Sequence, residues 1–382
     1  MKLNHPSEAL EYVVATMERF PERQAIPLWE AARFGTRRAH SGLVINYLIS
    51  PDDSGEKVNA VELPEIEAPV GQDGALIRQI ARLLEPLKML NQVTLALPLG
   101  RGTGSMVPCF GTPLNAEAGE TPAYTITLEE ALKRPVPDPE TSGIMPEIHA
   151  QIEFIKSRLP SGKGLYIAMP NMQGPFNLAH SILGDDAMIG PYGDVERYHE
   201  FMTRMADFWT AAWQTLQRWI GPEWLLPEQA RRTHIGECSA NLVSPEFFQE
   251  FILPYDLRTL QALARPVSMH PCSGPHVFRE TLELIPNIVE TEAGYIEKTA
   301  AGSISVDDAL RQIGDRPITL KIGQELPPGA EYEFIRCDLD RYADNPRLIF
   351  NYTGMHWRIR DRATIQDLHR NLDRYWAENL AR

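Results

Sequence analysis

Short apolar runs alternate with longer amphipathic stretches along most of this chain. Runs of four or five mainly apolar residues predict strands, and stretches with apolar residues at helical spacing predict helices between them. The predicted strands are residues 43–49, 93–97, 165–169, 233–236, 266–270, 288–292, 318–322 and 348–352. Because strands that alternate with helices are typical of parallel βα units, the pattern favours an α/β fold with parallel strands.

Two segments give clear helix predictions. Residues 195–220 carry apolar residues on one stripe, Phe201 and Met205 among them, and predict a long amphipathic helix. Ser244, Pro245 and Glu246 form an N-cap, a first-turn proline and a first-turn acid, which predict a helix start. Residues 6–35 are also expected to be mainly helical.

The number of βα units favours a (β/α)8 TIM barrel. Seven or eight units fit within residues 91–382, and we assign this segment to the barrel. Residues 1–90 are then a mainly helical N-terminal extension packed on the barrel, and the strand at 43–49 could belong to it. A doubly wound open sheet is the alternative, but no strand is followed by a Gly-X-Gly-X-X-Gly or Walker-type loop.

Composition indicates the cellular location and excludes some classes of binding partner. The chain has 382 residues, of which 43% are hydrophobic, and this is enough for a large core. The formal net charge of -14 argues against a nucleic acid or an anionic membrane as partner. The spacing of the four cysteines does not suggest disulfide bonds. Charged residues near the start of the sequence interrupt each apolar run that could form a signal peptide, and no run approaches the ~20 apolar residues of a membrane span. We therefore expect a cytoplasmic protein.

Polar residues gather directly after the predicted strands. In a parallel barrel this is the end where the chemistry lies. We assign a role in binding a small-molecule substrate to Arg101, Asn171, Gln173, Asn241 and Tyr352. Glu237 and His356 are the candidate proton-transfer groups.

His270 and Cys272 form the most informative pair. In a strand, positions i and i+2 point to the same face, so both side chains can reach one ion. Zinc favours such a nitrogen and sulfur pair, and Cys238 follows a neighbouring strand as a third ligand. The alternative is a buried structural pair, since free cysteine is often a core residue. His234 is interpreted as a core histidine, and Cys109 as a structural residue.

Several segments resemble the uroporphyrinogen decarboxylase superfamily. They are Met-Gln-Gly-Pro-Phe-Asn-Leu-Ala at 172–179, the Ser-Pro-Glu-Phe-Phe and Phe-Ile-Leu-Pro-Tyr blocks within 241–255, His-Pro-Cys-Ser-Gly at 270–274, and the segment 313–323. These blocks occur in family order across roughly residues 90–375. The resemblance implies a TIM barrel with its site at the strand ends.

The superfamily has two branches with different chemistry. The decarboxylases act on uroporphyrinogen without metal, and their arginine-rich signature has no good counterpart here. The methyltransferases use Zn2+ held by a His-X-Cys pair and a distant Cys, and they move a methyl group between a corrinoid on a partner protein and a thiol such as coenzyme M. His270 and Cys272 match this branch. Met355 stands where the distant Cys is expected, so Glu237, Cys238 or His356 would complete the metal site.

Three hypotheses follow. The first is zinc-dependent methyl transfer, with the corrinoid on a separate protein because no Asp-X-His-X-X-Gly segment is present. The second is metal-free decarboxylation with Arg101, Asn171, Gln173 and His356 as binding groups. The third is a non-catalytic protein that binds a tetrapyrrole or a corrinoid.

Overall fold

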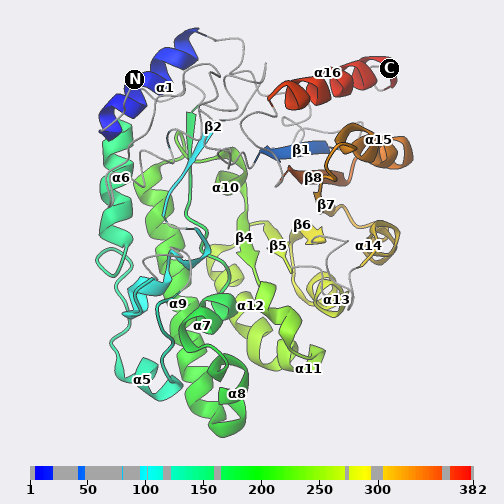
Figure 1. Cartoon of the computed structure of the whole chain (residues 1–382). Coiled ribbons are helices and arrows are strands. Elements are labelled where there is room, and N and C mark those ends of the chain that lie inside the picture. Colours follow the sequence, from blue (N-terminus) through cyan, green and yellow to red (C-terminus); the bar gives the residue numbers. More distant parts are fainter. Residues whose placement is uncertain are drawn as a thin grey trace. The chain divides into compact units, whose positions relative to one another are not determined.

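The chain divides into two compact units. The computed structural model describes residues 5–19, 42–47, 80, 95–100, 102–114, 122–158, 165–271, 275–293, 304–354 and 362–379. Unit 1 comprises Met1–Leu97, Ile155–Leu165 and Lys321–Arg382, and unit 2 comprises Pro98–Phe154 and Tyr166–Leu320. Figure 1 shows the elements of both units.

Unit 1 contains the two ends of the described chain. Its elements are α1 (Pro6–Arg19), β1 (Gly42–Tyr47), most of β7 (Thr319–Glu325), α15 (Glu331–Tyr342), β8 (Leu348–Gly354) and α16 (Arg362–Asn379). β1 pairs with β8 in parallel, from Gly42 opposite Ile349 to Tyr47 opposite Gly354. A strand from the first fifty residues therefore lies beside the last strand of the chain.

Unit 2 carries the central strands and most helices. The elements before β4 are η3 (Val107–Phe110), α5 (Leu128–Lys133), α6 (Met145–Arg158), α7 (Pro175–Leu183), α8 (Asp186–Gly193), α9 (Val195–Ile220) and α10 (Pro227–Arg231), with β2 (Leu95–Pro98) and β3 (Leu165–Ala168) at the division between units. From β4 onward they are β4 (Thr233–Gly236), η4 (Cys238–Leu242), α11 (Pro245–Phe247), a π-helical turn (Phe248–Ile252), α12 (Leu253–Leu263), β5 (Val267–His270), α13 (Pro275–Leu284), β6 (Ile288–Ala293) and α14 (Val306–Ile313).

The strands of unit 2 lie parallel and in chain order. β4 pairs with β5, and β5 pairs with β6. Separately from this sheet, Ile167 of β3 accepts from Leu226 N–H (3.1 Å) and donates to Trp224 C=O (2.7 Å), a parallel bridge just before α10. This order places the carboxyl ends of the three strands at one edge.

α9 is the main helix of unit 2. Asp194 caps its start by accepting from Arg197 N–H at 3.1 Å, and Gly221 ends it with φ 80°. Its apolar stripe is buried, and the helix packs against α7 and α12, beside which Figure 1 shows it. The helix predicted at 195–220 is confirmed with both ends, and so is the Ser244 cap, which accepts from Phe247 N–H at 3.2 Å.

The structure confirms a mixed α/β fold with parallel strands. All eight predicted strands are present, with ends that differ by up to three residues. The helix predicted at 6–35 is confirmed over Pro6–Arg19, and its remainder lies outside the described residues. The boundary at residue 90 and the closure of the strands into a barrel stay predictions. Within the described part of the chain, no helix is long and apolar enough to cross a membrane.

Candidate functional site at the ends of β4, β5 and β6

The register of the three strands sorts their residues onto two faces. Ile235, Met269 and Thr291 are fully buried and lie on one face. His234 lies opposite Ser268, and Gly236 lies opposite His270, on the other face. Because successive side chains alternate, polar residues at the ends of the strands meet on this second face.

His270 is the centre of this polar face. Its Nδ1 lies 2.8 Å from Oε2 of Glu292, the corresponding residue of β6. The ring also hydrogen-bonds to the thiol of Cys238, which begins η4 directly after β4 and Glu237. Burial alone would lower the pKa of His270, but the Glu292 carboxylate and the bond to Cys238 raise it to about 10. The imidazole is therefore held between a thiol and a carboxylate.

A second polar layer lies two residues earlier along the strands, on the same face. His234 Nδ1 lies 3.2 Å from Ser268 Oγ, and Ser268 donates to Glu290 Oε1 at 2.9 Å. Arg232 Nη1 binds the other oxygen of Glu290 at 2.8 Å. Glu290 is thus neutralised by an arginine, and Glu292 is left for His270. The interpretation of His234 as a core histidine was wrong, because its side chain is exposed and lies on the face of Ser268 rather than that of Ile235.

Glu237 lies on the opposite side of the chain from this polar face. It is fully buried, and its carboxylate accepts from Phe176 N–H (3.0 Å) and Asn177 N–H (2.9 Å) at the start of α7. The approach requires Gly174, since a Cβ there would lie 2.1 Å from Oε1 of Glu237. Glu237 therefore anchors α7 to the end of β4, and its oxygens are occupied by backbone donors.

Asp256 of α12 completes this buried cluster. It is fully buried, and none of the described residues donates an N–H to its carboxyl, which faces Glu237. Burial raises the pKa of both groups, that of Asp256 to about 8. The Asp256 carboxyl raises the pKa of Glu237 further, whereas the hydrogen bond with Glu237 lowers that of Asp256. Two carboxylates cannot both ionise at contact distance in a dry site, so the pair holds one proton at neutral pH.

Three of the predicted substrate-binding residues bind neighbouring loops. Asn171 Oδ1 accepts from Gln173 N–H at 3.0 Å in the turn after β3. Gln173 has a positive φ of 56°, and its Nε2 donates to Thr103 C=O at 2.5 Å, which joins the loops after β3 and β2. Asn241 Nδ2 donates to Pro271 C=O at 2.8 Å. These side chains hold the strand-end loops in their conformation. The hydrogen bonds of Asn171 and Gln173 are exposed to solvent.

The remaining predicted residues are distributed differently. Arg101, Cys272 and His356 lie outside the described residues. Tyr352 belongs to unit 1, where it is fully buried and donates to Asp338 Oδ2 at 2.6 Å. The structure thus brings together Cys238 and His270 from the predicted set, with Cys272 two residues further along the chain.

The donor atoms fit a zinc ion at two positions. Cys238 and His270 offer the sulfur and nitrogen that zinc prefers, and Glu292 occupies the place of the carboxylate that commonly orients a zinc-bound histidine. No group of three or more His, Cys, Asp or Glu side chains in the described part of the chain is arranged around one ion. A third ligand therefore has to come from elsewhere, and Cys272 is the candidate.

Two residues of the site were missed by the sequence analysis. Glu292 was given no role, although strand alternation places it in line with His270. Asp256 lies in α12 directly after the Phe-Ile-Leu-Pro-Tyr block, and no spacing in the sequence connects it with Glu237.

Comparison with known proteins supports the fold. No family model matches the chain, and no curated protein does. Among solved structures, a methyltransferase from Methanosarcina mazei matches with a TM-score of 0.54 and 14% identity, over 80% of this chain and 86% of that one. The chain has a uroporphyrinogen-decarboxylase-like fold.

A second solved structure also matches, at a lower score. It is a B12-independent methionine synthase from Shewanella sp. W3-18-1 in complex with selenomethionine, with a TM-score of 0.40 and 14% identity, over 61% of this chain and 68% of that one. The likeness to the Methanosarcina protein shows the fold that the resemblance implied.

Proposed function

We propose that this uroporphyrinogen-decarboxylase-like protein transfers a methyl group between a corrinoid on a partner protein and a thiol. The observation that carries the proposal is the placement of His270 between the Cys238 thiol and the Glu292 carboxylate at the strand ends. The proposal takes the described strands as parts of a closed (β/α)8 barrel, which their parallel pairing and chain order support.

Zinc is the metal that this donor set fits. Cys238, His270 and Cys272 would hold it, and it would act as a Lewis acid that lowers the pKa of the acceptor thiol. Glu292 accepts the Nδ1 proton of His270, which fixes the tautomer and leaves Nε2 for the ligand position. A histidine oriented in this way loses little freedom when it binds a metal.

The segments around the candidate site position Cys238 and His270. Glu237 anchors α7 next to the start of η4, so the backbone on which Cys238 lies is held at two points, by Glu237 and by the Asn241 bond to Pro271. The neutralised layer of Glu290 and Arg232 lies beneath His270. Glu237 is thus proposed to position the site rather than to transfer a proton to substrate.

In the proposed reaction, the acceptor thiolate forms a carbon–sulfur bond to the methyl group. The carbon–cobalt bond of the methylcorrinoid breaks at the same time, and its electron pair stays on cobalt. No other oxidant or reductant is needed.

Metal analysis of the purified full chain tests the proposal. We expect about one zinc per chain, and losses of most of it in His270→Ala, Cys238→Ala and Cys272→Ala. Cys337→Ala is the matched control, because Cys337 is an exposed residue of α15. Methylcobalamin and coenzyme M serve as probes, and thiol methylation is followed by the change in visible absorption.

Two results would contradict this function. Wild-type protein without stoichiometric zinc would remove the metal step, and equal zinc content in Cys238→Ala and Cys337→Ala would remove Cys238 from the site. Activity on an acidic tetrapyrrole that persists in the presence of a chelator would favour decarboxylation instead.

A further inference from the structure

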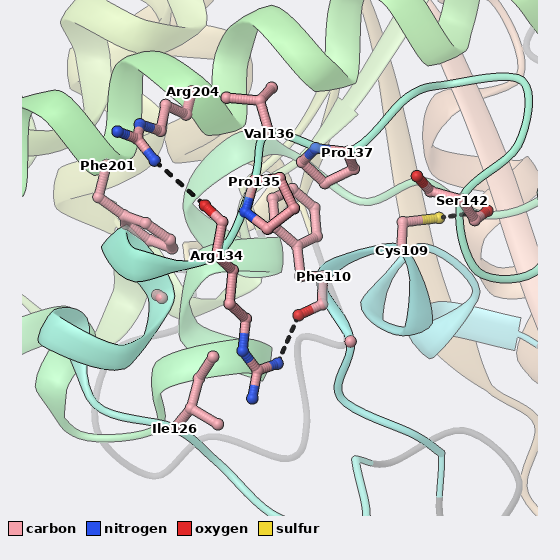
Figure 2. Close-up of a pocket in the computed structure, with 12 residues that line it drawn as sticks. Cys109, Phe110, Ile126, Arg134, Pro135, Val136, Pro137, Ser142, Phe201 and Arg204 are labelled. Carbon is pink, nitrogen blue, oxygen red and sulfur yellow. Dashed lines mark hydrogen bonds between the residues drawn. The ribbon is translucent and has the colours of Figure 1, made fainter.

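A cavity of about 270 Å³ lies between α9 and the crossover that joins β2 to β3, and none of its residues belongs to the strand-end site. Its walls come from η3, from the segment that follows α5, and from α9 (Figure 2). The residues that line it are Cys109, Phe110, Gly111, Ile126, Ala131, Arg134, Pro135, Val136, Pro137, Ser142, Phe201 and Arg204. All of them lie in unit 2.

The walls are mainly apolar and are held in place without a ligand. Phe201 and Ile126 are buried, and Pro135 and Pro137 fix the backbone on either side of Val136. The side chain of Val136 is 54% exposed, although it lies at an apolar cavity. A ligand that filled the cavity would cover apolar surface that is now in contact with water.

Hydrogen bonds of two arginines hold the three walls together. Arg134 Nη1 donates to Phe110 C=O at 2.6 Å, which joins the end of α5 to η3. Arg204 Nη1 donates to Leu132 C=O at 3.1 Å and to Arg134 C=O at 3.5 Å, which joins α9 to the same segment. Figure 2 shows the bonds to Phe110 and to Arg134 on two sides of the cavity. The cavity is therefore preformed.

The charge around the cavity is unusual for this chain. The whole sequence has 51 Asp and Glu against 37 Lys and Arg, yet no Asp or Glu is among the described residues that line the cavity. Arg204 pairs with Glu200 one turn earlier on α9, so its charge is compensated. Arg134 uses one of its five N–H donors on Phe110, and Phe110 C=O is the one acceptor recorded for its side chain in the described structure.

Two neighbouring groups lie near Arg134. Glu130 attracts Arg134 electrostatically, but its Oε2 accepts from the N–H and the hydroxyl of Thr127 in the capping box of α5, and no ion pair joins it to Arg134 among the described residues. The Cys109 thiol donates to Ser142 C=O at 3.4 Å, and burial raises its pKa to about 12, so it stays an uncharged part of the wall. Among the described residues, the cavity thus offers one guanidinium without an ion-paired carboxylate beside an apolar chamber.

We propose that this cavity binds a small amphiphilic anion, with its carboxylate on Arg134 and its apolar body against Phe110, Val136 and Phe201. An apolar cavity of 150 Å³ accommodates benzene, so this volume suits a ligand of roughly ten non-hydrogen atoms. The site is independent of the proposed methyl transfer and goes beyond it.

Titration calorimetry of the full chain with octanoate tests the site. We expect one-to-one binding with a Kd of roughly 0.1–1 mM, and at least tenfold weaker binding of octan-1-ol, which has the same chain without the charge. Arg134→Gln keeps a donor for Phe110 C=O and should weaken octanoate binding about tenfold. Arg218→Gln is the control, because Arg218 is an exposed residue of the same helix as Arg204 and does not line the cavity.

A second variant guards against misfolding of Arg134→Gln. Val136→Glu changes an exposed residue at the rim of the cavity, so the variant should fold. Its negative charge should weaken octanoate binding at least tenfold. No binding of octanoate, equal binding of octanoate and octan-1-ol, or equal effects of Arg134→Gln and Arg218→Gln would each overturn the site. Zinc content and methyl transfer do not enter any of these readouts, so the test stands apart from that of the proposed function.

Discussion

The buried pair of Glu237 and Asp256 makes protein stability depend on pH in a predictable direction. Glu237 accepts two backbone N–H groups, while Asp256 has no such donor, so the geometry favours Glu237 as the anion and Asp256 as the protonated acid. Replacing Asp256 by Asn keeps the shape and supplies an N–H donor to Glu237 without any titrating proton. Asp256→Asn should therefore remove the pH dependence that this pair contributes and keep the fold.

The magnitude follows from the pKa of Asp256, which burial raises to about 8 from a value near 4 in an unfolded chain. A carboxyl with a raised pKa binds its proton more tightly in the folded protein. Its contribution to stability is therefore greatest below pH 4 and is lost as the pH rises towards 8. The slope is about 1.4 kcal/mol per pH unit, so wild type should lose about 3 kcal/mol relative to Asp256→Asn between pH 5 and 7.

Urea unfolding followed by tryptophan fluorescence measures this difference. Both proteins are unfolded at pH 5, 6 and 7, and the difference in free energy between them is compared, which cancels the titration of all other groups. Asp207→Asn is the matched control, because Asp207 is exposed and pairs with Arg258 at 2.6 Å. A difference between wild type and Asp256→Asn that stays constant from pH 5 to 7 would refute the shared proton. Glu237→Gln should be destabilised at every pH, since its amide N–H₂ would face a backbone N–H.

Three further predictions concern other parts of the chain. Gly174→Ala should destabilise the protein by about 2 kcal/mol or more in urea unfolding, because its Cβ would meet Glu237, whereas Gly193→Ala, with nothing within 4 Å, should have little effect. Alkylation of Cys109 at pH 8 should be about a hundredfold or more slower than that of exposed Cys337 by mass spectrometry, and equal rates would contradict the raised pKa of Cys109. Burial lowers the pKa of His369 to about 4, so the contribution of this group to stability is complete above pH 6.5 and is lost as the pH falls towards 4. The loss amounts to about 3 kcal/mol in wild type, and it should be absent in His369→Gln when both proteins are unfolded in urea across this pH range.

Much of the fold could be predicted because local rules and tertiary packing agree. The helix α9 has its cap at Asp194, an apolar stripe along one side and a glycine with positive φ at its end, so the sequence indicates both ends. β4 was predicted at its observed residues, Thr233–Gly236. Pairing of β1 with β8 could not be predicted in this way, because it joins residues some 300 positions apart.

The site could be predicted in part, and strand alternation explains which part. His270 and Cys238 follow neighbouring strands, so proximity at one edge was expected and is observed. Glu292 could have been found by the same rule, because it occupies the position of β6 in line with His270 on the next strand. The role of Asp256 depends on how α12 packs against β4, and no local pattern in the sequence encodes that contact.

Glu237 shows why a residue at a strand end need not face the site. It immediately precedes Cys238, at the point where β4 has ended and η4 begins. Cys238 turns to His270, whereas Glu237 turns to the helix side, where the first N–H groups of α7 have no partner within the helix. Gly174 leaves the space that the carboxylate needs. The two adjacent residues therefore have different roles: Cys238 contacts His270 in the candidate site, and Glu237 anchors the start of α7 beside it.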